Sequence, residues 1–238
     1  MTLINAALIV ASGRGSRAGG DVPKQYQLIG DKPVLWHTIN NFINHQKIDK
    51  ILVVIHPDDV ALYESVIAQL DATKILPHSF GGTERQYSVT HGLKAISHLA
   101  PQNILIHDGA RPFLTTSLID DLIAACDQYL GAIAATPITD TIKSVKNKQD
   151  EYIDKTLDRD CLWAAQTPQA FDFNTIIKAH ADVSQMGENK LFTDDAAIFE
   201  YFDISVKLVK STNQNIKITH PEDFLWANAK LALLNGDI

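Results

Sequence analysis

The chain alternates short apolar runs with stretches in which apolar residues recur every three or four positions. A short apolar run bounded by polar or turn residues is typical of a buried parallel strand, and the longer period is typical of an amphipathic helix. The apolar runs predict strands at residues 6–11, 51–55, near 74–76, 103–106, 131–136, 204–209 and 215–218. The helical periods predict helices from Pro33, from Asp58, behind Thr83, at 117–129, 174–181 and 194–202, and from Pro221.

Repeated alternation of strands and helices predicts an α/β fold, with a mostly parallel sheet and helices on both of its faces. In such sheets, ligands bind at the carboxyl ends of the strands. Residues 12–24, 81–88 and 108–111 each follow a predicted strand. We therefore expect these three segments to converge on one site.

Residues 141–157 depart from this pattern. Apolar and polar residues alternate at 141–145 and again at 152–156, and a polar turn at 147–150 separates them, which predicts a β-hairpin. Because an isolated hairpin is only marginally stable, we expect it to pack on another surface. No linker is long enough to separate two domains, so we expect one domain over residues 1–238 with an arm at about 138–160.

Composition narrows the class of protein. The 238 residues carry a formal net charge of −7, which argues against broad binding of nucleic acid or of an anionic membrane. The apolar runs are too short to span a bilayer, and no basic segment precedes the first of them, as a secretory signal would require. With 2 cysteines and no Cys-x-x-Cys motif, we expect a cytoplasmic protein without a disulfide framework.

A glycine-rich loop at residues 11–20 follows the first predicted strand. Backbone N–H groups of such a loop bind phosphate readily. Its glycines formally match a dinucleotide fingerprint, but the acidic residue expected at the end of the second strand, about 20 residues later, is missing, since that strand ends near His56. A P-loop is excluded because no Gly-Lys-Ser/Thr follows. Arg17 and Lys24 within one loop suit a triphosphate, although an ordinary glycine-rich turn with solvated basic residues stays open as an alternative.

Two further motifs follow predicted strands. Asp108, directly after the apolar run 104–106, stands where Mg²⁺ would be held between a carboxylate and phosphate oxygens, with Arg111 as an oxyanion clamp beside it. The alternative is a turn-forming Asp before a glycine. In the segment 81–88, a glycine pair, Thr83 and Ser88 are suited to contacting the edge of a base, whereas the alternative is that Thr83 only caps a helix, with Gln86 completing the capping box.

Other polar residues suggest less. Asp194 and Asp195 are expected only to cap a helix behind Thr193. The histidines of the chain that follow or precede predicted elements, His56, His107 and His220, lack the spacing of metal ligands.

Several motifs in this order resemble a known family. They are the loop residues 11–17, then 23–25, 107–112, 140–143, 166–169 and 215–219. Together they resemble the 2-C-methyl-D-erythritol 4-phosphate cytidylyltransferases, nucleotidyltransferases of the non-mevalonate isoprenoid pathway, from Ala6 to about Ala229. The chain departs from the family pattern at Ser12, where Ala is usual, at Ala18, where Met is usual, and at Thr83, where an acidic residue is frequent.

The resemblance implies a Rossmann-like sheet with a protruding β-hairpin arm for dimerisation, and it implies roles for individual residues. The catalytic residues that it implies are Arg17, Lys24 and Lys217, with Asp108 holding Mg²⁺ or another divalent cation. The implied nucleotide-binding residues are Ala11, Ser12, Gly13, Gly15, Gly82, Thr83 and Ser88. The implied substrate-binding residues are Arg111, Thr141, Arg159 and Thr167, of which the last two would reach the substrate of the partner subunit in a homodimer.

The implied reaction joins CTP and 2-C-methyl-D-erythritol 4-phosphate to give 4-diphosphocytidyl-2-C-methyl-D-erythritol and pyrophosphate. A ribitol-5-phosphate cytidylyltransferase is the alternative within the class, and the pairs 140–141 and 162–163 favour methylerythritol phosphate. An NAD-dependent oxidoreductase and a non-catalytic nucleotide-binding module are kept as alternatives from other classes.

Overall fold

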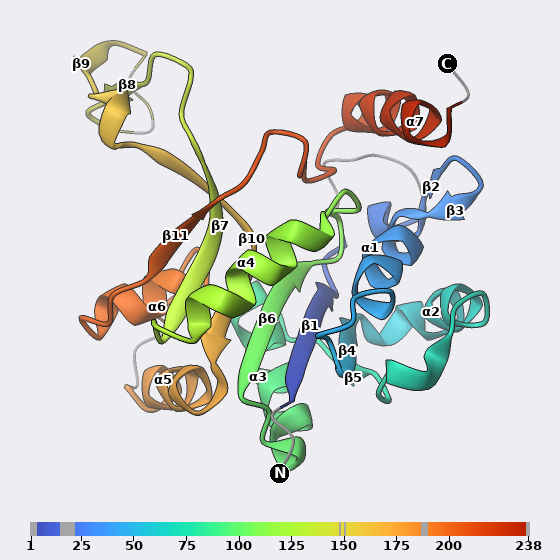
Figure 1. The fold of residues 1–238 in the computed structure, drawn as a ribbon. Helices are drawn as coiled ribbons and strands as arrows, with labels where there is room; N and C mark the ends of the chain where they lie inside the picture. Colours follow the sequence, from blue (N-terminus) through green and yellow to red (C-terminus); the bar gives the residue numbers. More distant parts are fainter. Residues whose placement is uncertain (1–3, 15–21, 148, 150, 187–189, 237–238) are drawn as a thin grey trace.

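A central twisted sheet forms the middle layer of the molecule (Figure 1). The structure is a computed structural model that describes residues 4–14, 22–147, 149, 151–186 and 190–236. Within these residues, seven strands lie in the order β11-β7-β10-β6-β1-β4-β5. Their bounds are β1 Asn5–Ala11, β4 Lys50–Ile55, β5 Ser79–Phe80, β6 Asn103–Asp108, β7 Gly131–Pro137, β10 Trp163–Asp172 and β11 Lys207–Lys210. All neighbouring strands are parallel except β10, which runs antiparallel to both β6 and β7.

Helices cover both faces of this sheet, as the sequence predicts. On one face lie α1 (Val34–Ile43), α2 (Val60–Ile67) and α4 (Thr116–Cys126), and on the other lie α3 (Arg85–Ile96), α5 (Phe173–Gln185) and α6 (Ala196–Tyr201) (Figure 1). Successive side chains of a strand point to opposite faces, so Ala7 and Ile9 of β1 pack with the first set, and Ala6 and Leu8 with the second. Burial of β1 on both faces therefore explains why residues 6–11 are all apolar.

Shorter elements complete the fold. The small ladders are β2 (Leu28–Ile29) with β3 (Lys32–Pro33), and β8 (Lys143–Val145) with β9 (Ile153–Thr156). The 3₁₀ turns are η2 Lys24–Tyr26, η3 Pro57–Asp59, η4 Ala72–Lys74, η5 Ser97–Leu99 and η6 Arg159–Cys161. The last helix, α7 (Pro221–Asn235), lies against β2–β3, where the Asn228 side chain accepts a hydrogen bond from the Gly30 amide at 2.8 Å. None of the described helices combines the length and apolar character that crossing a bilayer demands.

Two predicted strands are wrong. Lys74 ends the 3₁₀ turn η4, and Ile75 makes only an isolated bridge to Ile51. Pro77 lacks the N–H that would continue a ladder. The strand of that region is β5, a few residues later. Residues 215–218 form a loop held by bonds to other segments, such as the Ile218 amide to the Ala110 carbonyl at 2.9 Å.

The structure differs from the sequence-based prediction at two further elements beside the predicted site, helix α3 and strand β10. Helix α3 begins at Arg85 with Glu84 as the N-cap residue, so the predicted capping box of Thr83 and Gln86 is wrong. The side-chain oxygen Oε1 of Gln86 instead accepts a hydrogen bond from the Phe192 amide at 2.9 Å. The long strand β10 was not predicted, because the polar run 166–169 interrupts its alternation and its pairing with β7 shifts register there.

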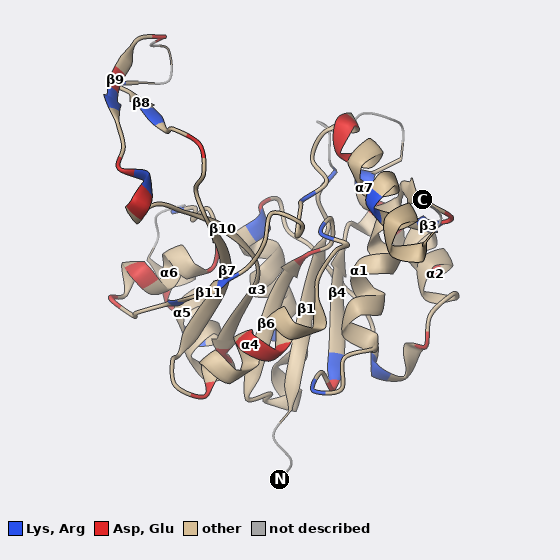
Figure 2. Cartoon of the chain, turned by 45° about the horizontal axis from the view of Figure 1, so that its top comes forward, with Lys and Arg blue, Asp and Glu red and all other residues tan. Residues whose placement is uncertain are grey.

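The predicted hairpin is confirmed as the ladder β8–β9, which extends beyond the sheet in both views (Figures 1 and 2). Its turn residues 148 and 150 lie outside the described part of the chain. Tyr152 and Ile153 on the arm are 85% and 64% exposed. The expectation that the arm packs on another surface stays a prediction.

Candidate active site

A cavity of about 390 Å³ opens at the carboxyl ends of the central strands. The loop after β1, the segment leading into α3 and the loop after β6 meet there, together with Lys217 from the loop before α7. This is the convergence that the sequence predicts. The lining residues include Ala11, Ser12, Gly13, Lys24, Gly82, Thr83, Ser88, Asp108 and Lys217 from the predicted site.

A second cavity of about 270 Å³ adjoins the first. Both cavities are lined by Arg85, Asp108 and Lys217, so these three residues lie at their junction. The remaining residues that line the second cavity are Arg111, Ala165, Gln166, Thr167, Gln169, Thr193 and Asp194. The predicted substrate residues Arg111 and Thr167 therefore lie together, in a cavity that strand β10 completes.

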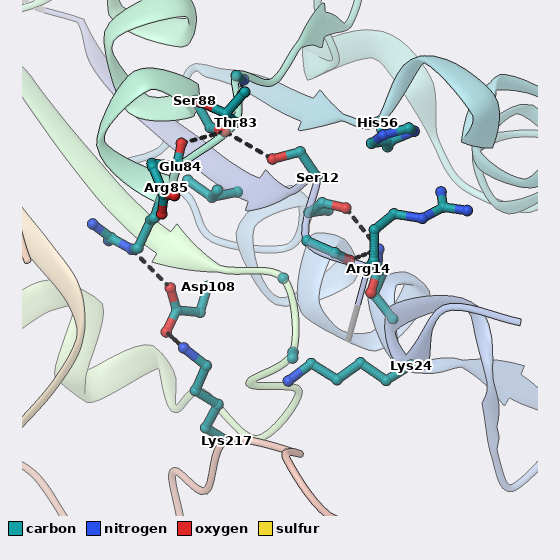
Figure 3. Close-up of a pocket in the computed structure, with 17 residues that line it drawn as sticks. Ser12, Arg14, Lys24, His56, Thr83, Glu84, Arg85, Ser88, Asp108 and Lys217 are labelled. Atoms are coloured by element: carbon teal, nitrogen blue, oxygen red, sulfur yellow. Dashed lines mark hydrogen bonds and ion pairs between the residues drawn. The ribbon is translucent and has the colours of Figure 1, made fainter. Parts of the chain in front are cut away.

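Asp108 is the centre of this junction (Figure 3). Its Oδ2 accepts from Lys217 Nζ at 2.8 Å and lies 3.7 Å from Arg111 Nε, while its Oδ1 lies 3.3 Å from Arg85 Nε. Burial alone would raise the pKa of the Asp108 carboxyl, but the charges of Lys217, Arg85 and Arg111 hold that pKa well below its usual range. The buried carboxylate is therefore ionised at neutral pH.

Below Asp108, a chain of hydrogen bonds fixes the strand end. Thr167 Oγ1 accepts a hydrogen bond from the Asp108 amide at 3.0 Å. The same hydroxyl lies 3.1 Å from His107 Nδ1, to which it donates a hydrogen bond. His107 Nε2 lies 3.1 Å from the Arg111 carbonyl, which can only accept, so Nε2 carries the hydrogen. This pattern is that of a neutral imidazole, and burial accordingly lowers the pKa of His107 to about 4.

His107 makes stability depend on pH. Between its ordinary pKa of 6.5 and about 4, the unfolded chain binds a proton that the folded chain does not, so stability falls as the pH falls through this window. We expect this residue to contribute a loss of about 3 kcal/mol across the window. Urea unfolding at several pH values should show a steeper acid loss in the wild type than in His107→Gln, which keeps both hydrogen-bond roles. Parallel curves for the two proteins would contradict the assignment.

At the other end of the first cavity, a hydroxyl cluster lies at the start of α3 (Figure 3). Ser88 Oγ accepts from the Gly82 amide at 3.1 Å, donates to the Glu84 carbonyl at 3.1 Å and lies 2.9 Å from Ser12 Oγ. A Cβ added at Gly81 would collide with the Ser12 side chain, so this close approach requires glycine. The cluster supplies fixed hydrogen-bonding groups at one end of the cavity.

The glycine-rich loop is held from below. Gln25 is buried, and its side-chain amide donates to the Ala11 carbonyl at 2.7 Å and to the Gly13 carbonyl at 3.0 Å. The neighbouring Lys24 extends across the cavity toward the side where Asp108 and Lys217 lie (Figure 3). Two of the three predicted catalytic cations, Lys24 and Lys217, therefore line the same cavity.

Not every predicted residue is brought together. Gly15 and Arg17 lie outside the described residues. Thr141 and Arg159 lie on the arm and are not among the residues that line either cavity. The Arg159 guanidinium donates to the Thr139 carbonyl at 2.9 Å, within the arm itself.

The structure adds residues that the sequence reasoning did not place. Arg85 lines both cavities, and it pairs with Asp195 at 2.8 Å as well as with Asp108. Asp194 does cap α6, since its Oδ1 accepts from the Ala197 amide at 3.0 Å, but Asp195 is instead a buried partner of a cation. Only the adjacency of two acids marked this position in the sequence, and adjacency did not reveal which one is buried.

Comparisons with known proteins identify the family of this chain. Residues 5–233 match the family model of 2-C-methyl-D-erythritol 4-phosphate cytidylyltransferase, IspD. The bifunctional enzyme IspD/IspF of Rhodopseudomonas palustris is 42% identical over 233 residues, which are 98% of this chain and 57% of that protein. This chain thus spans little more than half the length of that relative.

Two solved structures are similar to this chain over nearly their whole length. The 4-diphosphocytidyl-2C-methyl-D-erythritol synthase of Anaerococcus prevotii superposes with a TM-score of 0.83 at 33% identity, with 96% of each chain covered. The 2-C-methyl-D-erythritol 4-phosphate cytidylyltransferase of Francisella tularensis gives a TM-score of 0.77 at 30% identity, covering 95% of this chain and 99% of that one.

Proposed function

Because this chain belongs to the 2-C-methyl-D-erythritol 4-phosphate cytidylyltransferase family, we propose that it transfers the cytidylyl group of CTP to 2-C-methyl-D-erythritol 4-phosphate and releases pyrophosphate. The observation that carries this proposal is the junction of two cavities at Asp108 and Lys217. A transferase must hold two substrates with their reacting atoms side by side, and one shared cationic edge is where two phosphate groups would meet.

CTP occupies the larger cavity in this proposal. Its cytosine lies against Gly82, Thr83 and Ser88, and its phosphates run along the glycine-rich loop past Lys24 toward Lys217. The methylerythritol phosphate occupies the smaller cavity, where Arg111 and Thr167 face it. Arg17, which lies outside the described residues, is proposed to bind the triphosphate as well.

The chemistry follows from charge. A phosphate monoester is largely dianionic near neutral pH, so its oxygen attacks the α-phosphorus of CTP without a general base, and pyrophosphate leaves. The barrier is the approach of two anions, and Lys24 and Lys217 lower it by holding positive charge where negative charge develops. Lys217 is 39% exposed at its side chain, so it can turn from Asp108 toward a phosphate oxygen.

Asp108 is the proposed ligand for Mg²⁺ or another divalent cation. Among the described residues, no three His, Cys, Asp or Glu side chains gather into a metal-binding group. One ionised carboxylate at the cavity edge nevertheless fits Mg²⁺, which proteins commonly hold through one or two carboxylates and the substrate phosphates. The ion would supply further neutralisation of the phosphate charge.

The arm completes the proposal. Thr167 lines a cavity of its own chain, whereas Thr141 and Arg159 are not among the residues that line either cavity. We therefore propose that Thr141 and Arg159, instead of the pair Arg159 and Thr167 that the family resemblance implies, reach the polyol phosphate in a partner subunit of a homodimer. The exposed apolar side chains of the arm support a surface that another subunit covers.

The free thiols of Cys126 and Cys161 support the expected cytoplasmic location.

Pyrophosphate release with a panel of substrates tests this function. We expect turnover with CTP and methylerythritol phosphate, and a preference for CTP over UTP of about tenfold or more, because polar groups matched to cytosine would face uracil unpaired. Equal turnover of both nucleotides would remove the base-reading role of the Ser88 cluster. Faster turnover with ribitol 5-phosphate would assign the alternative substrate, and a change in nicotinamide absorbance would reveal an oxidoreductase.

A further inference from the structure

Arg85 joins two buried carboxylates that come from separate parts of the chain. From the first turn of α3, its Nε lies 3.3 Å from Asp108 Oδ1, and its Nη1 donates to Asp195 Oδ2 at 2.8 Å. Asp195 directly precedes α6 and is 1% exposed. One guanidinium therefore connects the end of β6 to the start of α6.

Asp195 is itself fixed from behind. Its Oδ1 lies 3.2 Å from Nε2 of the buried His180 on α5, and the backbone amide of Asp195 donates to Gln169 Oε1 at 3.0 Å. The other ring nitrogen of His180 lies 2.9 Å from Thr90 Oγ1 on α3. Helices α3 and α5 and strand β10 thus all hold the carboxylate that binds Arg85.

The charges around Asp195 keep its carboxylate ionised. Burial alone would raise the pKa of Asp195, but Arg85 and His180 lower it below its usual range. For Arg85, burial opposes the charge, and the carboxylates of Asp195 and Asp108 outweigh it and raise its pKa. Arg85 is therefore a permanent cation between two permanent anions.

The arrangement of contacts shows what this cation does to Asp108. Arg85 contacts Oδ1, whereas Lys217 and Arg111 contact Oδ2. A guanidinium has a rigid plane, and Asp195 fixes that plane through Nη1. The hydrogen bond from Arg85 to Oδ1 then limits the rotation of the Asp108 carboxylate about its Cβ–Cγ bond.

We propose that Arg85, clamped by Asp195, is a positioning residue that fixes the orientation of the Asp108 carboxylate, so that Oδ2 faces Lys217 and the cation and phosphates that bind at the junction. The inference rests on the proposed function, because it takes the ligand at the junction to be CTP with a divalent cation.

The first variant is Arg85→Lys, which keeps the positive charge but replaces the rigid fork by a single ammonium that cannot hold both carboxylates in fixed geometry. We expect a folded protein whose Mg²⁺ requirement rises and whose kcat falls about 10- to 100-fold, the effect typical of groups that orient a metal ligand. Isothermal titration calorimetry of CTP with and without Mg²⁺ supplies a readout apart from activity. The gain in CTP affinity that Mg²⁺ brings should shrink in Arg85→Lys, while the affinity without Mg²⁺ changes little.

The second variant is the pair Arg85→Gln with Asp195→Asn, which removes one cation and one anion together, so that no unpaired buried charge stays at position 195. We expect the same loss of the Mg²⁺ response. The matched control is Val183→Ala on α5, which removes buried packing near the same helix without touching the network. It should lower the melting temperature and keep the wild-type Mg²⁺ response.

A double-mutant cycle decides whether Arg85 acts through Asp108. In an Asp108→Asn background, Arg85→Lys should change kcat/KM and the Mg²⁺ response little further, since the group that it orients has lost its charge. Independent, multiplicative losses would overturn the proposal. The proposal would also be overturned if the wild type is active and the Arg85→Lys variant has the same kcat and the same Mg²⁺ response as the wild type. That outcome leaves the proposed function intact. Absence of pyrophosphate release from the wild type with every substrate pair would overturn the proposed function instead.

Discussion

Replacing Asp108 by asparagine should reduce turnover about 100-fold or more, while the protein stays folded. Asparagine is nearly isosteric with aspartate but neutral, so Lys217 and Arg85 lose the anion that holds them at the junction. A divalent cation would also lose its charged protein ligand. The measurement is kcat at saturating and limiting Mg²⁺, with circular dichroism to confirm the fold.

Asp121→Asn is a suitable control for Asp108→Asn, because it makes the same chemical change at an exposed position on α4. It should keep wild-type turnover at both Mg²⁺ concentrations. If Asp108→Asn turned over at close to the wild-type rate in limiting Mg²⁺, Asp108 would not be the metal ligand.

Mixing two inactive variants should restore activity if the arm crosses between subunits. Lys24 lines the cavity of its own chain, whereas Arg159 lies on the arm. Lys24→Ala and Arg159→Ala homodimers should each be poorly active. In a mixed dimer, one site combines the intact Lys24 of one chain with the intact Arg159 of the other, and the second site carries both lesions.

Random pairing makes about half of the dimers mixed, each with one good site of two, so recovery should approach about a quarter of wild-type activity. The matched control mixes Lys24→Ala with Lys217→Ala. Both residues line the same cavity of one chain, so every site in the mixture keeps one lesion and no activity returns. A mixture of Lys24→Ala and Arg159→Ala that has exchanged subunits without gaining activity would place Arg159 in the site of its own chain.

Some features of the fold follow from the sequence because they depend on local pattern. The apolar run of β1 and the turn residues after it specify a strand buried on both faces, whatever its neighbours are. Parallel strands connected by helices share one carboxyl edge, so the approach of the glycine-rich loop, the segment before α3 and Asp108 also follows from order along the chain. The alternation at residues 141–157 likewise sufficed to predict the arm.

Other features arise only from pairing between distant segments. Strand β10 enters the sheet antiparallel between β6 and β7, and it brings Thr167 against the Asp108 amide across 59 positions of sequence. The loop that carries Lys217 looks like a strand in sequence, but side chains decide its course: Asn215 donates to the Thr167 carbonyl at 2.8 Å. Hydrogen bonds between distant segments produce no periodic pattern in the sequence.

The partner of a buried charge is the clearest case. From sequence alone, Asp194 and Asp195 are equivalent helix-capping acids, and Arg85 only lies between the two residues of the predicted capping box, Thr83 and Gln86. The fold places Asp195 2.8 Å from Arg85, 110 positions away, and buries Asp195 beside His180, whereas the Arg85 side chain keeps 26% of its surface exposed at the cavities. Local pattern determines which segments are strands and helices, because propensity and burial act within a few residues. Tertiary structure decides which charges meet, because an ion pair forms wherever the folded backbone brings two side chains together, at any separation along the chain.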